Sequence, residues 1–326
     1  MKIPNFLALL PLMVAAETTY PMVFHKAPSP LSPDAVVEDW PRFFGPRDNC
    51  TSHESPLRKI FPKEGLPKVF ELARGDSYSS PILIAGKLLH FHAVDSKETL
   101  DCHDAETGKR LWTFHYPITY KDRYGFSSGP RSSPVVHQGR IYLIGVTAML
   151  HCLDLKTGRM IWKRNLKKEF EIPQYFFGYG PNPVVHGDKL IVNVGGKENK
   201  TSGTSVAAFQ LKDGKTAWKH EDQWGASYAS PVITTIHGKE VALILAAGES
   251  KPAHGGLLVL NPTNGTLYSR FPWRAGLYES VLASSPLSLP NNQVFISDCY
   301  ELGGVLLQFN PELKPSPVWS ERFFGM

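Results

Sequence analysis

Two histidines are the first residues whose spacing suggests chemistry. His90 and His92 stand two apart in an alternating run that predicts a β-strand, so both side chains face the same side of a sheet. That spacing suits two ligands of a zinc ion. However, His90 occupies a position that Leu143 and Val192 fill in later repeats of the chain, and no third ligand can be identified. We therefore predict buried, hydrogen-bonded histidines and no metal site.

The four cysteines are the next candidates for chemistry. An even number of cysteines, here Cys50, Cys102, Cys152 and Cys299, suggests disulfides in a secreted protein. Cys102 and Cys152 occupy the same position of a repeat, however, and equivalent positions in neighbouring sheets lie about 10 Å apart. A disulfide needs Cα atoms within roughly 7 Å. We therefore expect Cys102 and Cys152 to be small buried residues without a bridge, and the pairing of Cys50 and Cys299 stays open.

Aromatic loops that lead into each repeat are the most suggestive feature. They are rich in glycine and carry few charges, which is the composition that a face for a ligand or a partner needs. Repeat symmetry predicts that they all lie on one side of the molecule, which we call the loop face. Alternatively, the rings only fill a central channel, and the sequence leaves both roles open. The candidate binding residues are Tyr78, Tyr124, Arg131, Tyr175, Tyr179, Trp224, Tyr228, Tyr278 and Glu279. No residue stands out as catalytic.

The elements that position these loops come from a repeat of about fifty residues. A small residue followed by proline opens each unit, with prolines at positions 81, 134, 183, 231 and 286. Each unit then has the pattern of four strands, with a glycine turn after the first strand and an Asp-x-x-Thr-Gly turn after the third. Such a period predicts an all-β propeller of four-stranded antiparallel blades. The propeller domain is expected over residues 40–326, with five units at about 79–131, 132–180, 181–228, 229–283 and 284–326.

A tryptophan stands four residues past the turn glycine, on the fourth strand of most units. A large flat ring at that position suits the dry seam between neighbouring sheets, and glycine supplies the positive φ that a tight turn requires. The fourth unit has Tyr268, one position early. We predict structural roles for these repeat residues, namely Asp104, Gly108, Trp112, Asp154, Gly158, Trp162, Gly214, Trp218 and, as the counterpart in the fifth unit, Trp319.

The Asp-x-x-Thr-Gly-x-x-x-Trp unit resembles the PQQ-like repeat of quinoprotein dehydrogenases and of the outer-membrane assembly factor BamB. The segments 39–46 (DWPRFFGP) and 278–286 (YESVLASSP) also resemble bacterial secreted proteins of this repeat family. The resemblance covers residues 39–326 and implies the fold. It implies an activity only weakly, because one fold hosts many functions.

The segment Lys68–Leu72 precedes the first unit and lacks the turn motif. In the family that the chain resembles, such a segment is expected to be the outer strand of the last blade, and about eight blades are expected. We therefore expect a C-terminally incomplete propeller, in which Lys68–Leu72 does not pair with the end of the chain. The alternative is a five-bladed ring that this strand caps.

Composition and the N-terminal segment limit the class of protein. Of the 326 residues, 42% are hydrophobic and 20% charged, with a net charge of +5 and no dense basic cluster, so nucleic-acid binding is not supported. Residues 1–16 combine Lys2, a short apolar run and Ala15-Ala16, which predicts a secretory signal peptide. The proline-rich residues 17–39 predict a linker. No other stretch approaches the length of a membrane span, so the mature chain is expected in the bacterial periplasm or outside the cell.

Two functions from different classes follow from the resemblance. The first, which we favour, is a non-catalytic scaffold of the cell envelope that needs no cofactor and holds an envelope protein or polysaccharide on the loop face. The second is a quinoprotein dehydrogenase of alcohols or sugars that uses PQQ with calcium. Such an enzyme needs a stacking slot, cationic contacts for the quinone carboxylates, oxygen ligands for calcium and a base. The alcohol dehydrogenases of that class also have two adjacent cysteines, and this sequence has no Cys-Cys pair.

Overall fold

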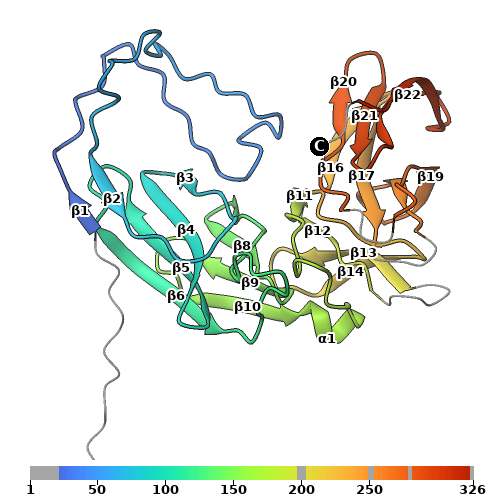
Figure 1. Cartoon of the computed structure of the whole chain (residues 1–326), viewed down its shortest axis with the longest axis horizontal. Coiled ribbons are helices and arrows are strands. Elements are labelled where there is room, and N and C mark those ends of the chain that lie inside the picture. Colours follow the sequence, from blue (N-terminus) through green and yellow to red (C-terminus); the bar gives the residue numbers. More distant parts are fainter. Residues whose placement is uncertain (1–21, 197–202, 249–252, 278–280, 324–326) are drawn as a thin grey trace, which may run out of the picture.

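A computed structural model describes residues 22–196, 203–248, 253–277 and 281–323, and its regular structure is nearly all β (Figure 1). Consecutive strands form antiparallel sheets in chain order, as the repeat predicts. The first three sheets contain β3 (Ile82–Ile84), β4 (Lys87–Val94), β5 (Lys97–Asp104) and β6 (Arg110–Pro117); β7 (Val135–His137), β8 (Arg140–Ile144), β9 (Met149–Asp154) and β10 (Met160–Asn165); β11 (Val184–His186), β12 (Lys189–Asn193), β13 (Gly203–Gln210) and β14 (Thr216–Asp222).

The last two sheets follow the same plan. In the fourth sheet both β15 and β16 pair with β17, β15 near its end and β16 nearer its start. One single-turn helix, α1 (Leu166–Phe170), follows β10. The fourth sheet contains β15 (Gly225–Ala226), β16 (Val232–Ile236), β17 (Lys239–Ala247), β18 (Gly256–Leu260) and β19 (Leu267–Pro272). The fifth contains β20 (Leu287–Leu289), β21 (Gln293–Asp298), β22 (Gly303–Phe309) and β23 (Pro315–Glu321). No helix in the described ranges is long and apolar enough to cross a membrane.

The hydrophobic core is divided into seams between consecutive sheets. Along β12, Leu190 and Val192 pack in the cluster shared with the second sheet, whereas Ile191 packs in the cluster shared with the fourth. This is the two-residue alternation of a strand that is buried on both faces. Two further clusters join the first sheet to the second and the fourth to the fifth. The strands of the three inner sheets are therefore apolar on both sides, because each of these sheets has a neighbour on both sides.

Tryptophan and glycine from adjacent units hold the first three seams together. The indole of Trp112 lies against Gly158 of the next sheet so closely that a Cβ atom there would come within 2.5 Å of the ring. Its Nε1 donates a hydrogen bond to the carbonyl of Leu155, at 3.3 Å. Trp162 and Trp218 repeat both contacts one and two sheets further on. These contacts support the structural role that we predicted for these residues from the sequence.

The fourth and fifth units depart from this pattern. Ser269 takes the register position of the tryptophan, opposite Val259, and its hydroxyl donates to the carbonyl of Leu313 in the fifth sheet. Tyr268 instead accepts a hydrogen bond from Asn261. Trp319 pairs with Leu306 after a shifted bulge, is 41% exposed, and packs beside Phe295 rather than on a turn glycine. Ser269 thus replaces the hydrogen bond that an indole would donate, but it does not replace the contact area of the ring.

The turn motif has the internal geometry that its residues predict. Asp104 Oδ1 accepts hydrogen bonds from the backbone N–H and the hydroxyl of Thr107, at 2.9 and 2.7 Å, and Asp154 does the same with Thr157. These bonds lower the pKa of both carboxyl groups. The following glycines, Gly108 and Gly158, both have a φ of +71°.

The segment before the first unit forms a small sheet of its own. Strand β2 (Phe70–Leu72) pairs with β1 (Met22–Phe24), which lies inside the predicted linker. The ring of Phe70 covers Gly108 as a tryptophan covers the turn glycine of later sheets. The sequence predicted neither β1 nor this contact.

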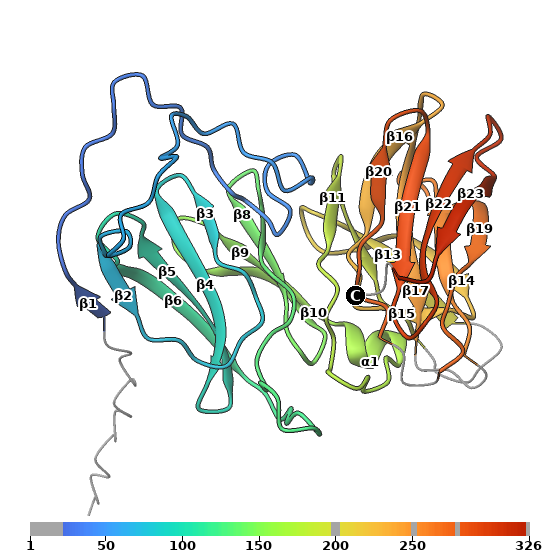
Figure 2. The same cartoon turned by 45° about the horizontal axis from the view of Figure 1, so that its top comes forward.

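The five sheets stand side by side in an arc, with the first sheet at one end and the fifth at the other (Figures 1 and 2). Strand β2 pairs with β1 and, as expected, not with the described C-terminal strand β23. The expected signal peptide falls on residues outside the described ranges. All four cysteines are free thiols, and Cys102 and Cys152 are fully buried in β5 and β9.

A pair of glycines in the second sheet tests the locking contact. Gly158→Ala and Gly139→Ala both place an L side chain at a φ near +72°, but only Gly158 faces an indole, and nothing lies near Gly139. We expect Gly139→Ala to lower the free energy of unfolding by about 1–2 kcal/mol from backbone strain, and Gly158→Ala by about 1–3 kcal/mol more from overpacking. Urea denaturation measures both, and equal losses would contradict the role of Trp112.

Candidate binding site on the loop face

A ladder of hydrogen bonds brings the loops of the five sheets together. In the first four sheets, the residue before the proline that opens the repeat donates its backbone N–H to the side chain of the equivalent residue in the next sheet. Thus Ser80 bonds to Ser133 at 2.8 Å, Ser133 to Asn182 at 2.5 Å, Asn182 to Ser230 at 3.2 Å, and Ser230 to Ser285 at 2.9 Å. A short polar side chain is therefore required at this position, and the loops before it converge.

An open apolar hollow of about 330 Å³ lies where these loops meet. Three predicted residues, Tyr78, Arg131 and Tyr228, line it. The loop before each of the five sheets contributes at least one side chain, which is the convergence that repeat symmetry predicted. The complete lining of this hollow is Tyr78, Phe126, Arg131, Phe177, Tyr228, Val281 and Ala283.

A buried carboxylate shapes the loop that carries the most exposed rings. Asp122 Oδ1 accepts the backbone N–H groups of Tyr124 and Phe126, at 2.9 and 3.1 Å. Its Oδ2 accepts hydrogen bonds from the Tyr120 hydroxyl and from Arg131, both at 3.0 Å. Burial alone would raise the pKa of Asp122, but these donors hold it below its usual value. Tyr124 and Phe126 are consequently presented to solvent, 52% and 57% exposed.

The charge of Arg131 is used within the protein. The side chain is 8% exposed and pairs with Asp122, and it also donates to the carbonyl of Gly129. Its guanidinium lies 5.2 Å from the ring centre of Tyr78 and 5.4 Å from that of Tyr120, within the range of cation–π attraction. Arg131 therefore supports the wall of the hollow and is already paired.

Aromatic contacts hold the rest of the lining. The hydroxyl of Tyr228 accepts the backbone N–H of Phe177 at 2.9 Å, and their rings lie 5.9 Å apart. Phe126 and Tyr124 approach the same Phe177 ring at 5.9 and 5.8 Å. Phe126 and Phe177 lie in the loops from which sequence reasoning selected tyrosines, so their position was available as a signal. Val281 and Ala283 are not aromatic, so only their position just before Ser285 could have indicated that they line the hollow.

Three predicted binding residues lie in the seams instead of the hollow. The hydroxyl of Tyr175 donates to Gly195 and accepts from Ala226, and that of Tyr179 donates to Asn193. Trp224 is 4% exposed, and the guanidinium of Arg270 lies 4.1 Å from its ring centre. These three rings pack in the clusters between sheets, which is neither the binding role nor the channel-filling role that the sequence left open. Tyr278 and Glu279 lie outside the described residues.

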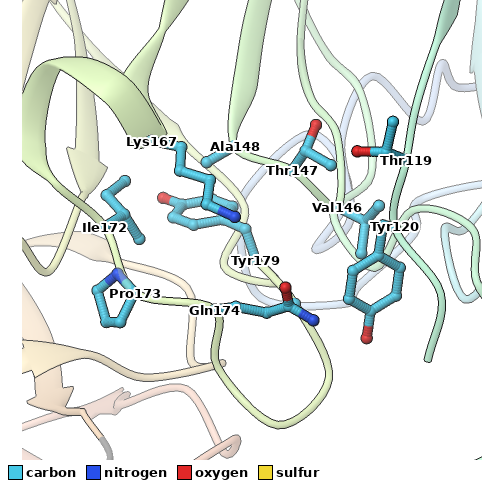
Figure 3. A pocket seen from close by; sticks show the side chains of 11 residues that line it. Thr119, Tyr120, Val146, Thr147, Ala148, Lys167, Ile172, Pro173, Gln174 and Tyr179 are labelled. Atoms are coloured by element: carbon cyan, nitrogen blue, oxygen red, sulfur yellow. The ribbon is translucent and has the colours of Figure 1, made fainter. Parts of the chain in front are cut away.

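A second, smaller pocket is lined by the segment after β6, the turn between β8 and β9, and the segment from α1 to Tyr179 (Figure 3). Lys167 reaches into it from α1 across Tyr179, with Tyr120 on the other side. Its volume is about 50 Å³, whereas one water molecule takes about 30 Å³ in the liquid. The pocket therefore suits water and is too small for an organic cofactor.

The histidine pair is structural. Nδ1 of His92 accepts the backbone N–H of Gly75 at 3.0 Å, so the proton lies on Nε2, which is 3.0 Å from Asp101 Oδ2. The ring of His90 stacks on His92 at 4.2 Å, and burial lowers the pKa of His90 to about 4. Within the described ranges, no group of three or more histidine, cysteine, aspartate or glutamate side chains is placed to hold a metal ion.

Comparison with known proteins places this fold in a family. A family described as outer membrane protein assembly factor BamB matches residues 96–308, about two thirds of the chain. The chain belongs to this PQQ-like propeller family.

The individual relatives are alcohol dehydrogenases. The chain is 27% identical to a 1-butanol dehydrogenase (cytochrome c) of Thauera butanivorans over 49% of this chain and 23% of that protein. It is 28% identical to a quinoprotein ethanol dehydrogenase of Pseudomonas aeruginosa over 44% of this chain and 21% of that protein. The chain thus spans less than a quarter of the length of either relative.

Among solved structures, the quinohemoprotein alcohol dehydrogenase ADHIIG of Pseudomonas putida HK5 superposes with a TM-score of 0.53. The match has 14% sequence identity and covers 76% of this chain and 43% of the other. At that identity the likeness shows the shared fold and carries no activity with it.

The Asp122–Arg131 pair yields a test of how the loop is positioned. Asp122→Ala leaves a nearly buried guanidinium without its partner, so we expect the free energy of unfolding to fall by about 3–5 kcal/mol. Glu169→Ala, which breaks the surface pair with Arg164, should cost at most about 1 kcal/mol. Urea denaturation compares the two, and a loss for Asp122→Ala no larger than for Glu169→Ala would contradict this account.

Proposed function

We propose that this protein is a non-catalytic binding protein of the bacterial cell envelope, located in the periplasm or outside the cell, which holds an envelope protein or polysaccharide on its loop face. The hollow carries this proposal. Loops before all five sheets converge on it, its lining is almost wholly apolar, and Tyr78 and Phe126 stand at it more than half exposed. Exposed aromatic side chains grouped in a concave surface mark binding sites.

The polar groups of the hollow favour binding over catalysis. Arg131 is paired with Asp122, and the Tyr228 hydroxyl accepts the N–H of Phe177. A catalytic site needs a base or nucleophile within reach of the reacting atoms. The seven lining residues offer contact area and shape, and none is a carboxylate, histidine or cysteine.

The quinoprotein function remains the second candidate because one of the curated relatives is a quinoprotein ethanol dehydrogenase. The residues that line the hollow do not fit PQQ with calcium. The quinone carboxylates need cationic contacts, and the one cation in the lining, Arg131, already has a carboxylate partner. Calcium takes six to eight oxygen ligands, and the lining supplies no carboxylate. No step through the quinone is therefore derived for this chain.

The membership in the BamB family supports an envelope location and a partner that is a macromolecule. The proposal does not depend on the sequence outside the described ranges.

A photo-crosslinking side chain placed in the hollow tests the binding role. We expect p-benzoyl-phenylalanine at position 126 of the full-length protein to form a defined adduct with an envelope protein or polysaccharide in cells. The matched control is position 161 on the outer strand β10, where Ile161 is 44% exposed. Mass spectrometry identifies the adducts. Adducts of the same identity and yield at both positions would show that the hollow is not a binding site.

Addition of PQQ and Ca²⁺ to the full-length protein separates the two functions. The binding role predicts no bound-quinone absorbance after gel filtration and no alcohol-dependent reduction of a dye. A stoichiometric quinone spectrum with dye reduction would overturn the proposal in favour of the dehydrogenase.

A further inference from the structure

A buried glutamate bridges the first and second sheets, and neither the repeat nor the binding role requires it. Glu98 lies in β5 and is fully buried. Its Oε2 accepts a hydrogen bond from the hydroxyl of Tyr116 in β6 at 2.5 Å. Its Oε1 accepts the backbone N–H of Val146, in the second sheet, at 2.7 Å. One carboxyl group thus joins two sheets directly.

The space around this carboxyl is closed. A Cβ atom on Gly145 would lie 1.8 Å from Glu98 Oε2 and 2.2 Å from the Tyr116 hydroxyl, so only glycine fits there. The second sheet has Ala148 at the position of Glu98, six residues before the turn aspartate in both units. The seam that Ala148 joins therefore has no acid at this place, and the acid is a particular feature of the first seam.

Titratable groups face Glu98 from three directions, and no cation bonds to it. Tyr116 lies on β6, the ring of His151 on β9 lies 4.3 Å from the Tyr116 ring, and Arg131 lies in the loop before β7, paired with Asp122. Strand β4 contributes Ala93. Burial lowers the pKa of His151 to about 4, so it is neutral near pH 7. Burial raises the pKa of Glu98 to about 7, although Tyr116, Val146 and Arg131 each lower it.

A short chain of contacts connects this carboxyl to the hollow. The carbonyl of Val146 accepts the backbone N–H of Tyr179 at 2.9 Å. Gly178 lies against the side chain of Val146, and its neighbour Phe177 lines the hollow and bonds to Tyr228. A change in how Glu98 holds Val146 therefore reaches the loop 175–179.

We propose that Glu98 is a pH-sensitive latch: when protonated it holds the first seam closed, and its ionisation loosens the turn at Val146 and the loop 175–179 behind the hollow. The carboxylate form must stay in the seam without a cation, whereas the acid form is neutral and can remain there at less cost. The proposal concerns the seam and stands or falls independently of the partner.

The sign of the effect follows from linkage. Because the closed seam binds the proton more tightly than the open one, protection against opening is full below about pH 4.5 and is lost as pH rises through about 7. One proton changes the opening constant by up to about tenfold per pH unit inside that window. His151 acts in the opposite direction, since its lowered pKa favours opening as pH falls from about 6.5 toward 4. Comparison with a variant that lacks only the acid removes this second effect.

Hydrogen exchange of the full-length protein tests the latch. Amide protection of residues 145–148 and 175–179 is measured from pH 5 to pH 8, corrected for intrinsic exchange, in the wild type and in Glu98→Gln. Glutamine keeps an oxygen for Val146 but does not titrate. We expect the ratio of wild-type to variant protection to fall by up to about tenfold per pH unit toward pH 7 and then to level off. A ratio that does not vary with pH would overturn the proposal.

Two controls keep the test decisive. Strand β21 belongs to the fifth sheet, at the other end of the arc from Glu98, and the ratio for its amides should not change with pH; an equal change there would show global loosening and refute the latch. If Glu98→Gln does not fold, Tyr116→Phe provides the test. It removes a donor that favours the carboxylate, so the upper end of the wild-type transition should move to higher pH, and an unchanged transition would refute the proposal.

Discussion

The indole of one sheet resting on the turn glycine of the next is the contact on which the rest of the arrangement depends. The glycine must have no side chain, because a Cβ atom at Gly158, Gly214 or Gly265 would enter the indole of the preceding unit. The indole in turn donates its N–H to a carbonyl of the same turn. One residue pair thereby fixes both the spacing and the rotation of adjacent sheets near their outer strands. The ladder from Ser80 to Ser285 fixes their other end. Because both ends of the sheets are held in this way, the loops before the sheets converge.

Most polar side chains near the loop face are bonded within the protein, and this determines which groups remain available to a ligand. In the seams, hydroxyl and guanidinium groups form hydrogen bonds within the protein, as those of Tyr175, Tyr179 and Arg270 do. At the loop face the same happens one layer below the surface, where Asp122 gathers two amides, a hydroxyl and Arg131. What is left exposed above this layer is ring area. A rigid floor with aromatic walls loses little conformational entropy when something binds, and this preorganisation favours recognition.

The repeat made the fold predictable in detail, because the same short motif has to solve the same packing problem at every seam. Cys102 and Cys152 were correctly assigned to one repeat position in this way, and the structure pairs them with Trp112 and Trp162. The site was predictable only as a set of loops. Whether a tyrosine faces the hollow or a seam depends on whether its hydroxyl finds a strand-end carbonyl, as Tyr179 finds Asn193, and that is a three-dimensional property that spacing does not encode. Strand β1 was missed for a related reason, since its partner β2 lies about fifty residues away and the segment has no period.

Glu98 shows where a departure from the repeat carries more information than the repeat itself. At a position equivalent to Ala148, evolution of a purely structural seam would be expected to keep a small apolar residue, because an unpaired buried carboxylate is costly. The chain instead provides it with Tyr116, the Val146 amide and a glycine that makes room. Two hydrogen-bond donors and a residue without a side chain thus surround this one carboxyl group. They are the arrangement expected of a group whose protonation state, rather than its volume, matters to the loop face.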